Sequence, residues 1–148
     1  MPFKPLRLLI AYDEARGLCG RVVPRMKELL EDRAFSVELL PISDNPEPID
    51  FYDYDGLILG TPAFGLGWKG VGPTPKVEAW VKAQDGELDE VRVAVFCVYE
   101  LRPGWTLRNT RQLVLDEGGD VVCSQAYSAA RPQVEEHILP AECMVRIR

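Results

Sequence analysis

The sequence predicts an α/β domain built on a five-stranded parallel β-sheet. Five short apolar runs alternate along the chain with segments of helical periodicity, which is the order that strand–helix–strand units produce. The first run, Leu6–Tyr12, is almost continuously apolar, as a strand buried on both faces of a sheet is. The chain has 148 residues and no internal repeat or interdomain linker, so we expect a single domain over residues 1–148.

The first half of the chain is predicted to supply three strands and one helix. We expect the strands at residues 6–12, 35–42 and 56–60. Residues 17–32 carry a helical pattern whose apolar face consists of Val22, Met26, Leu29 and Leu30. Pro24 is unfavourable inside a helix, so this helix should begin within a few residues before it. Residues 49–54 predict one helical turn at most.

The second half is predicted to supply two strands and two helices. We expect the strands at residues 91–99 and 121–127. The first helix should follow Thr74, whose hydroxyl suits a helix cap, with Pro75 in the first turn. The second helix is expected over Thr106–Glu117 and should end at the glycine pair 118–119.

The tail after Ser128 is only weakly patterned. A short helix over residues 133–138, interrupted by Pro132 and Pro140, and a last strand over 144–147 are the elements it could form. We therefore expect a truncated or irregular C-terminal element that leaves part of one sheet face uncovered. Because an exposed apolar face usually marks a partner surface, self-association as a two-fold homodimer is predicted.

Charge and composition exclude several classes of protein. Seventeen basic against 23 acidic residues give a formal net charge of -6, which argues against broad nucleic-acid binding and against an anionic membrane surface. No apolar run approaches the ~18–20 residues that span a bilayer. The four cysteines show neither C-x-x-C nor zinc-ligand spacing. These features predict a cytoplasmic protein with reduced thiols and no metal site.

Three loops are candidates for a ligand site, because ligands of open parallel sheets bind beyond the carboxyl ends of the strands. They are residues 13–20, 61–75 and 99–105. The second of them is long and rich in glycine and proline, and long loops in compact domains are often functional.

At these loops the sequence resembles the flavodoxin family over residues 6–127. Residues 8–12 look like the family's first strand, residues 54–65 closely resemble its third strand and flavin-contacting loop, and residues 91–99 resemble its fourth strand. The resemblance implies a three-layer sandwich that binds FMN non-covalently and transfers electrons or hydride. The protein would then be an electron carrier or a small reductase linked to NAD(P)H or a quinone. Its partner would be a redox protein or a small-molecule substrate.

The resemblance also implies where the cofactor would lie. The phosphate would lie at residues 16–20. The ring would lie between one aromatic wall from Phe64 and Trp68 and another from Tyr99 or Trp105. The cofactor-binding residues implied are Arg16, Gly17, Leu18, Cys19, Gly20, Thr61, Pro62, Ala63, Phe64, Gly65, Trp68, Tyr99 and Trp105. No catalytic residue is identified.

The phosphate loop departs from the family's pattern. Gly17 is kept, but Glu14, Arg16 and Cys19 stand where the family has Ser or Thr. A helix N-terminus and Arg16 would favour a phosphate, whereas the carboxylates of Asp13 and Glu14 would oppose one. Two hypotheses therefore stay open: an FMN-binding redox protein, and a flavodoxin-fold binding or assembly module that has lost FMN.

Cysteine and histidine chemistry gives weaker hypotheses. Cys19 lies near the start of a helix, where a thiol can be activated, so a thiol-dependent enzyme is a third hypothesis. Cys97 lacks the flanking glycines of a nucleophile elbow and is expected in the core, with Cys123 as its neighbour. A hydrolase triad would need His137, the single histidine, and nothing marks a serine as its nucleophile.

Overall fold

The structure, a computed structural model, describes residues 5–63 and 72–136. A parallel five-stranded sheet forms its middle layer, in the order β2-β1-β3-β4-β5. The strands are β1 (Arg7–Tyr12), β2 (Ser36–Pro41), β3 (Gly56–Ala63), β4 (Arg92–Tyr99) and β5 (Asp120–Ser128). All five predicted strands are thus confirmed, with ends that differ by a few residues.

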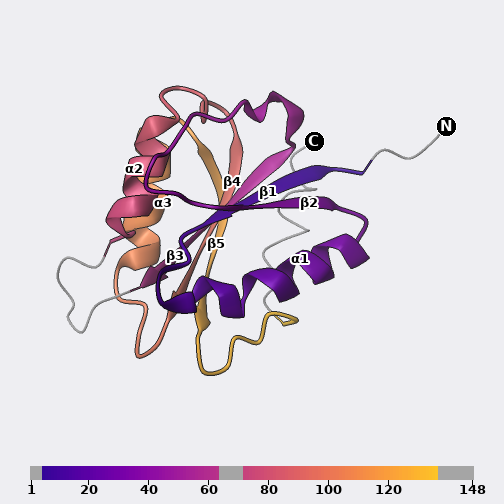
Figure 1. Cartoon of the computed structure of the whole chain (residues 1–148), viewed down its shortest axis with the longest axis vertical. Coiled ribbons are helices and arrows are strands. Elements are labelled where there is room, and N and C mark those ends of the chain that lie inside the picture. Colours follow the sequence, from indigo (N-terminus) through magenta and orange to yellow (C-terminus); the bar gives the residue numbers. More distant parts are fainter. Residues whose placement is uncertain (1–4, 64–71, 137–148) are drawn as a thin grey trace.

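Helices cover both faces of the sheet (Figure 1). Helix α1 (Val23–Asp32) packs on one face, and α2 (Pro75–Ala83) and α3 (Thr106–Asp116) pack on the other. Short 3-10 turns complete the described chain: η1 (Ala15–Gly17), η2 (Cys19–Arg21) and η3 (Phe51–Asp53). The predicted three-layer α/β architecture is therefore confirmed.

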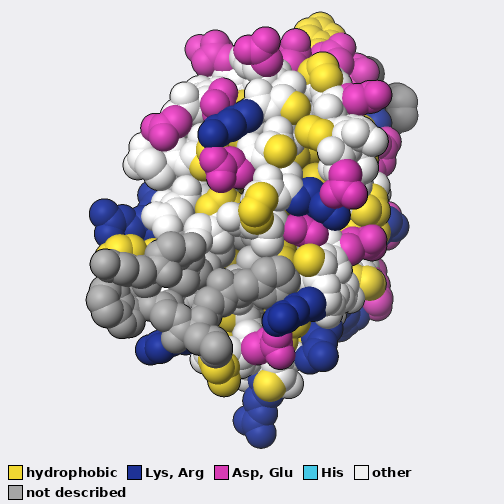
Figure 2. All heavy atoms as spheres, turned by 60° about the vertical axis from the view of Figure 1, so that its left-hand side comes forward, with side chains coloured by type: hydrophobic (Ala, Val, Ile, Leu, Met, Phe, Trp, Pro, Cys, Tyr) yellow, Lys and Arg dark blue, Asp and Glu magenta, His cyan; other side chains and the backbone are white. Residues whose placement is uncertain are grey.

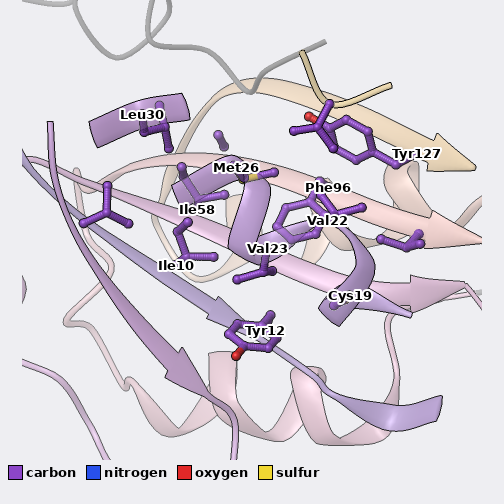
Figure 3. Close-up of a cluster of buried hydrophobic side chains, with 14 of the residues drawn as sticks. Ile10, Tyr12, Cys19, Val22, Val23, Met26, Leu30, Ile58, Phe96 and Tyr127 are labelled. Atoms are coloured by element: carbon purple, nitrogen blue, oxygen red, sulfur yellow. The ribbon is translucent and has the colours of Figure 1, made fainter. Parts of the chain in front are cut away.

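Two apolar clusters hold the layers together. Alternate residues of each central strand point to opposite faces, so Leu8 and Ile10 join the cluster under α1, whereas Leu9 and Ala11 join the cluster under α2 and α3. Figure 3 shows the first cluster, in which Met26 and Leu30 of α1 lie over the sheet. Since strands of this kind face apolar neighbours on both sides, their nearly continuous apolar sequences are explained.

The helix starts follow the local signals in the sequence. The hydroxyl of Thr74 accepts a hydrogen bond from the N–H of Val77 at 3.4 Å and caps α2, whose first residue is Pro75. Helix α1 begins at Val23, one residue before Pro24, as the proline requires. Residues 17–22, predicted to lie in that helix, form 3-10 turns and their connections instead, and the positive φ of Gly17, 68°, lies outside the right-handed α-helical range.

Three sequence expectations need correction. Strand β3 continues through Thr61–Ala63, which were expected in a loop, because β4 is long enough to pair with it as far as Tyr99. Cys123 lies opposite Ala94 and not beside Cys97, whose partner in β5 is Ala126. Residues 133–136 form a turn and no helix, while the rest of the expected helix and the strand at 144–147 fall outside the described residues.

Gly60 is required by the close approach of a buried ring. A Cβ at this position would lie 2.1 Å from Cζ of Phe96. The Phe96 ring is buried and packs edge-on against Tyr127, with ring centroids 6.0 Å apart, so it has no free space to move into. The middle of β3 therefore accepts only a residue without a side chain.

Gly60→Ala should destabilise the protein by about 1–3 kcal/mol, because the added methyl group overpacks the core against Phe96. Denaturant unfolding followed by circular dichroism measures the change. The matched control is Gly20→Ala, where no atom lies within 4 Å of the added Cβ and the change should stay within ~0.5 kcal/mol. Equal stabilities of the two variants would contradict this account of Gly60.

Candidate functional site

The sheet order places three loops at one edge. Strand order reverses between β1 and β3, and the loops after β1, β3 and β4 leave the sheet on the same side because the strands are parallel. The loop after β1 is anchored to β3, since the N–H of Asp13 donates to the carbonyl of Gly60 at 3.2 Å. The edge is therefore the candidate site, as the sequence predicted.

A buried polar network connects the loop after β1 to the start of α2. The carboxylate of Asp13 accepts the N–H of Ala15 on Oδ1 at 2.9 Å and the hydroxyl of Thr74 on Oδ2 at 2.5 Å. The N–H of Thr74 donates to Oγ1 of Thr61 at 3.2 Å. Asp13, Thr61 and Thr74 are all buried. This set of three residues is called the Asp13 network below.

The loop after β1 satisfies many of its own N–H groups. Gly17 donates to the carbonyl of Glu14 at 2.8 Å, and Arg21 donates to that of Leu18 at 3.1 Å. The N–H of Val22 donates to the carbonyl of Cys19 at 3.0 Å. These bonds close the consecutive turns η1 and η2, in which Arg16 takes a positive φ of 59°. Two consecutive turns thus stand where the start of a helix was expected.

Apolar side chains fill the space at the beginning of α1. Leu18, Cys19, Val22 and Val23 are buried in the core cluster under α1. Figure 3 shows Cys19, Val22 and Val23 there, in the same cluster as Tyr12 and Phe96. The side chains of Leu18 and Cys19 are therefore out of reach of a ligand, while Arg16, Gly17 and Gly20 are exposed.

Both arginines of this loop have partners. The guanidinium of Arg16 lies 3.7 Å from the carboxylate of Glu100, which follows β4. Nη1 of Arg21 donates to the carbonyl of Ala129 at 3.2 Å. The Arg16–Glu100 pair is exposed and therefore weak, but it draws the loops after β1 and β4 together.

The loop after β4 carries exposed apolar side chains. Leu101 is 74% exposed and Trp105 is 51% exposed, although both are large and apolar. The Trp105 ring has the guanidinium of Arg108 over it at 5.6 Å, and Tyr99 at the end of β4 is half-buried. The predicted Trp105 is thus available at the surface, whereas Thr61, Pro62 and Ala63 are buried in β3. Phe64, Gly65 and Trp68 lie outside the described residues.

Sequence reasoning missed two contributions to the site. Leu101 was not singled out, because a single leucine between a strand and a helix carries no periodic signal. Thr74 was identified as a helix cap only, and its bond to Asp13 spans 61 positions of sequence, so no local pattern could reveal it.

The residues present fit one end of FMN and not the other. Exposed aromatic and apolar side chains at the end of β4 suit a flat ring. The loop after β1 does not suit a phosphate. The N–H groups of Gly17, Arg21 and Val22 bond to carbonyls within its turns, and the buried carboxylate of Asp13 accepts the N–H of Ala15. Residues 14, 16 and 19 carry no hydroxyl group.

Neither a cluster of metal-ligand side chains nor a membrane-spanning helix is found among the described residues. No group of three or more His, Cys, Asp or Glu side chains within residues 5–63 and 72–136 is arranged to hold a metal ion. Over the same ranges, no helix combines the length and apolarity needed to cross a bilayer.

The two buried cysteines of the candidate edge are inert thiols. Burial raises the pKa of Cys19, and the nearby charge of Asp13 raises it further. Burial also raises the pKa of Cys97 to about 12. A helix start that lowers a thiol pKa needs the sulfur at the open end of the helix, and Cys19 is instead packed into the core. The structure thus argues against the hypothesis of a reactive Cys19 thiolate.

A variant with Cys123→Ser and Cys143→Ser, which retains Cys19 and Cys97, should not react with Ellman's reagent at pH 7.5 in the folded state. Both thiols should react once guanidinium unfolds the chain, because only burial protects them. A rapidly reacting thiol in the folded variant would restore the thiol-enzyme hypothesis.

No protein-family model and no curated protein sequence matches this chain. Solved structures do match. A solution structure of two-electron reduced flavodoxin from Megasphaera elsdenii superposes with a TM-score of 0.72 at 20% identity, and 93% of each chain is covered. Oxidised Flavodoxin 1 from Bacillus cereus gives a TM-score of 0.68 at 19% identity over 94% of this chain and 92% of that one.

A longer protein shows the same likeness in part of its length. A point mutant of the flavodiiron protein from Thermotoga maritima gives a TM-score of 0.65 at 19% identity, over 91% of this chain and 35% of that one. At such identities the likeness concerns the fold. Together with the β2-β1-β3-β4-β5 sheet and its helices on both faces, it shows that this chain has the flavodoxin-like fold.

Proposed function

We propose that the protein is a flavodoxin-like redox protein that binds a flavin at the carboxyl edge of its sheet, with FMN as the cofactor that the family resemblance implies. The observation that carries the proposal is the pair of exposed apolar side chains, Leu101 and Trp105, beside half-buried Tyr99. Both side chains lie in the loop after β4, at the edge where ligands of open parallel sheets bind. The resemblance of residues 54–65 to the family's flavin-contacting loop supports the same place.

The chain's own residues would hold the ring and shield it from water. Trp105 offers an aromatic face, which stacks on flat conjugated rings. Leu101 would cover part of the ring and exclude solvent. Strand β3 supplies a rigid support, since Thr61, Pro62 and Ala63 are buried and paired to β4. A bound flavin would supply one- or two-electron transfer, and no residue of the chain is assigned a chemical step.

Charge favours a basic partner. Glu78, Asp116 and Glu117 line a cavity of about 560 Å³ between α2 and α3, together with Lys82. Figure 2 shows acidic side chains gathered at the upper end of this side of the molecule. With a net charge of -6, the protein would attract a basic redox partner by electrostatic steering.

The homodimer and the cytoplasmic location stay predictions. Sedimentation at micromolar protein concentration tests the homodimer.

The second candidate function is a binding or assembly module of the same fold without a flavin. The loop after β1 favours it, because the N–H groups of Ala15, Gly17, Arg21 and Val22 are already bonded within that loop. The two candidates differ in one observable, which is flavin binding itself.

The purified protein should bind added flavin with saturable quenching of flavin fluorescence, because stacking on an aromatic ring quenches the emission. Trp105→Ala should weaken binding by about 2- to 10-fold, the range expected for loss of one aromatic stacking partner. Tyr52→Ala is the matched control: Tyr52 is 92% exposed but lies in η3, which precedes β3 and so belongs to the opposite edge.

Unchanged affinity in Trp105→Ala, or an equal loss in Tyr52→Ala, would contradict the proposed place of the ring. A protein that shows no flavin absorbance after purification and no quenching on titration would exclude the first candidate and leave the binding module.

A further inference from the structure

We propose that the loop after β1 excludes a phosphate, so that the protein takes a flavin by its ring and does not prefer FMN to riboflavin. This inference rests on the proposed flavin binding and adds the chemical class of the ligand: a flat, uncharged ring system whose side chain carries no required anion. Residues 13–23 and Thr74 carry the inference, from four separate observations.

The first observation is the position of a carboxylate. Asp13 directly follows β1, and its side chain is 2% exposed. Both of its oxygens are engaged, one with the N–H of Ala15 and one with the hydroxyl of Thr74. A phosphate at this strand end carries a charge of about -1.5 to -2 at neutral pH and would meet a negative group that cannot turn away into solvent.

The second observation is that Asp13 already performs a phosphate's role toward the backbone. Anion sites at strand-to-helix loops work because free N–H groups point at the ligand. Here the N–H of Ala15 bonds to the carboxylate, and those of Gly17, Arg21 and Val22 bond to carbonyls within the turns. A phosphate would have to break these bonds to gain the same donors.

The third observation is the packing at the start of α1. Val22 and Val23 are fully or almost fully buried, and Pro24 in the first turn has no N–H to offer. Leu18 and Cys19 join the same core cluster. Turning any of these residues outward to open the helix end would expose apolar surface that is now buried.

The fourth observation concerns Arg16 and Arg21, whose positive charges could have offset the negative charge of Asp13 and attracted a phosphate. Arg16 pairs with Glu100, and Arg21 binds the carbonyl of Ala129. A phosphate could recruit Arg16 only in competition with Glu100, whose own negative charge would then remain beside the ligand. The charge, the bonded N–H groups and the packing of the loop after β1 all disfavour a phosphate. The ligand's binding energy must therefore come from the flavin ring.

The test is a comparison of dissociation constants for riboflavin and FMN by fluorescence titration of the full chain. The expected result is that riboflavin binds at least as tightly as FMN. FMN binding about tenfold or more tightly than riboflavin would overturn the inference while leaving the proposed function intact.

Two variants separate the buried network from net charge. Asp13→Asn keeps the shape and removes the charge, and it should shift the ratio of the two affinities toward FMN. Glu14→Gln removes an equal charge from an exposed neighbour and should shift the ratio much less. An equal shift in both variants would overturn the role of the Asp13 network. If Asp13→Asn fails to fold, the wild-type ratio still decides.

A probe without a flavin ring distinguishes failure of the proposed flavin binding from failure of the inference about the loop after β1. If neither flavin binds, the proposed function is wrong, and inorganic phosphate then tests the loop alone. Millimolar phosphate should leave the backbone amide resonances of residues 13–23 unchanged in NMR spectra. Saturable shifts of those resonances would show an open anion site and overturn the inference.

Discussion

The buried carboxylate of Asp13 organises the carboxyl edge of the sheet. Its oxygens hold the N–H of Ala15 and the hydroxyl of Thr74, and the backbone N–H of Asp13 donates to the carbonyl of Gly60. A buried carboxylate is stable only when its oxygens are satisfied, so these partners are obligatory for one another. The bonds fix where the first loop turns back and where α2 begins. The shape of the candidate site follows from this one group.

The rest of the edge is built around close packing. The Phe96 ring lies against Gly60 and Tyr127, so β3 passes close to the apolar cluster under α1. Strand β3 then continues to Ala63. The turns η1 and η2 then bring Leu18 and Cys19 into that cluster. Because these side chains are buried in the core, the loop after β1 contributes to the stability of the fold. The exposed apolar side chains of this edge lie in the loop after β4 instead.

A fold shared with flavodoxins does not by itself decide what is bound, since function depends on the site and not on the architecture. The likeness to the flavodoxins from Megasphaera elsdenii and Bacillus cereus extends over more than nine-tenths of the chain, at 20% and 19% identity. The sheet and the helices follow that architecture. The loop after β1 and the start of α1 carry the carboxylate of Asp13, the buried side chains of Val22 and Val23, and Pro24. A difference in ligand would arise at this place.

Local sequence determined the elements and the fold class. Apolar runs fixed the five strands, Thr74 and Pro75 fixed the start of α2, and Pro24 fixed the start of α1, because these signals act within one turn or one strand. Tertiary structure alone decided the length of β3, the register that separates Cys123 from Cys97, and the bond from Thr74 to Asp13. It also decided that Leu18 and Cys19 face the core and Trp105 faces solvent. Such outcomes depend on pairing and burial between segments far apart in the chain, and periodicity carries no information about those distances.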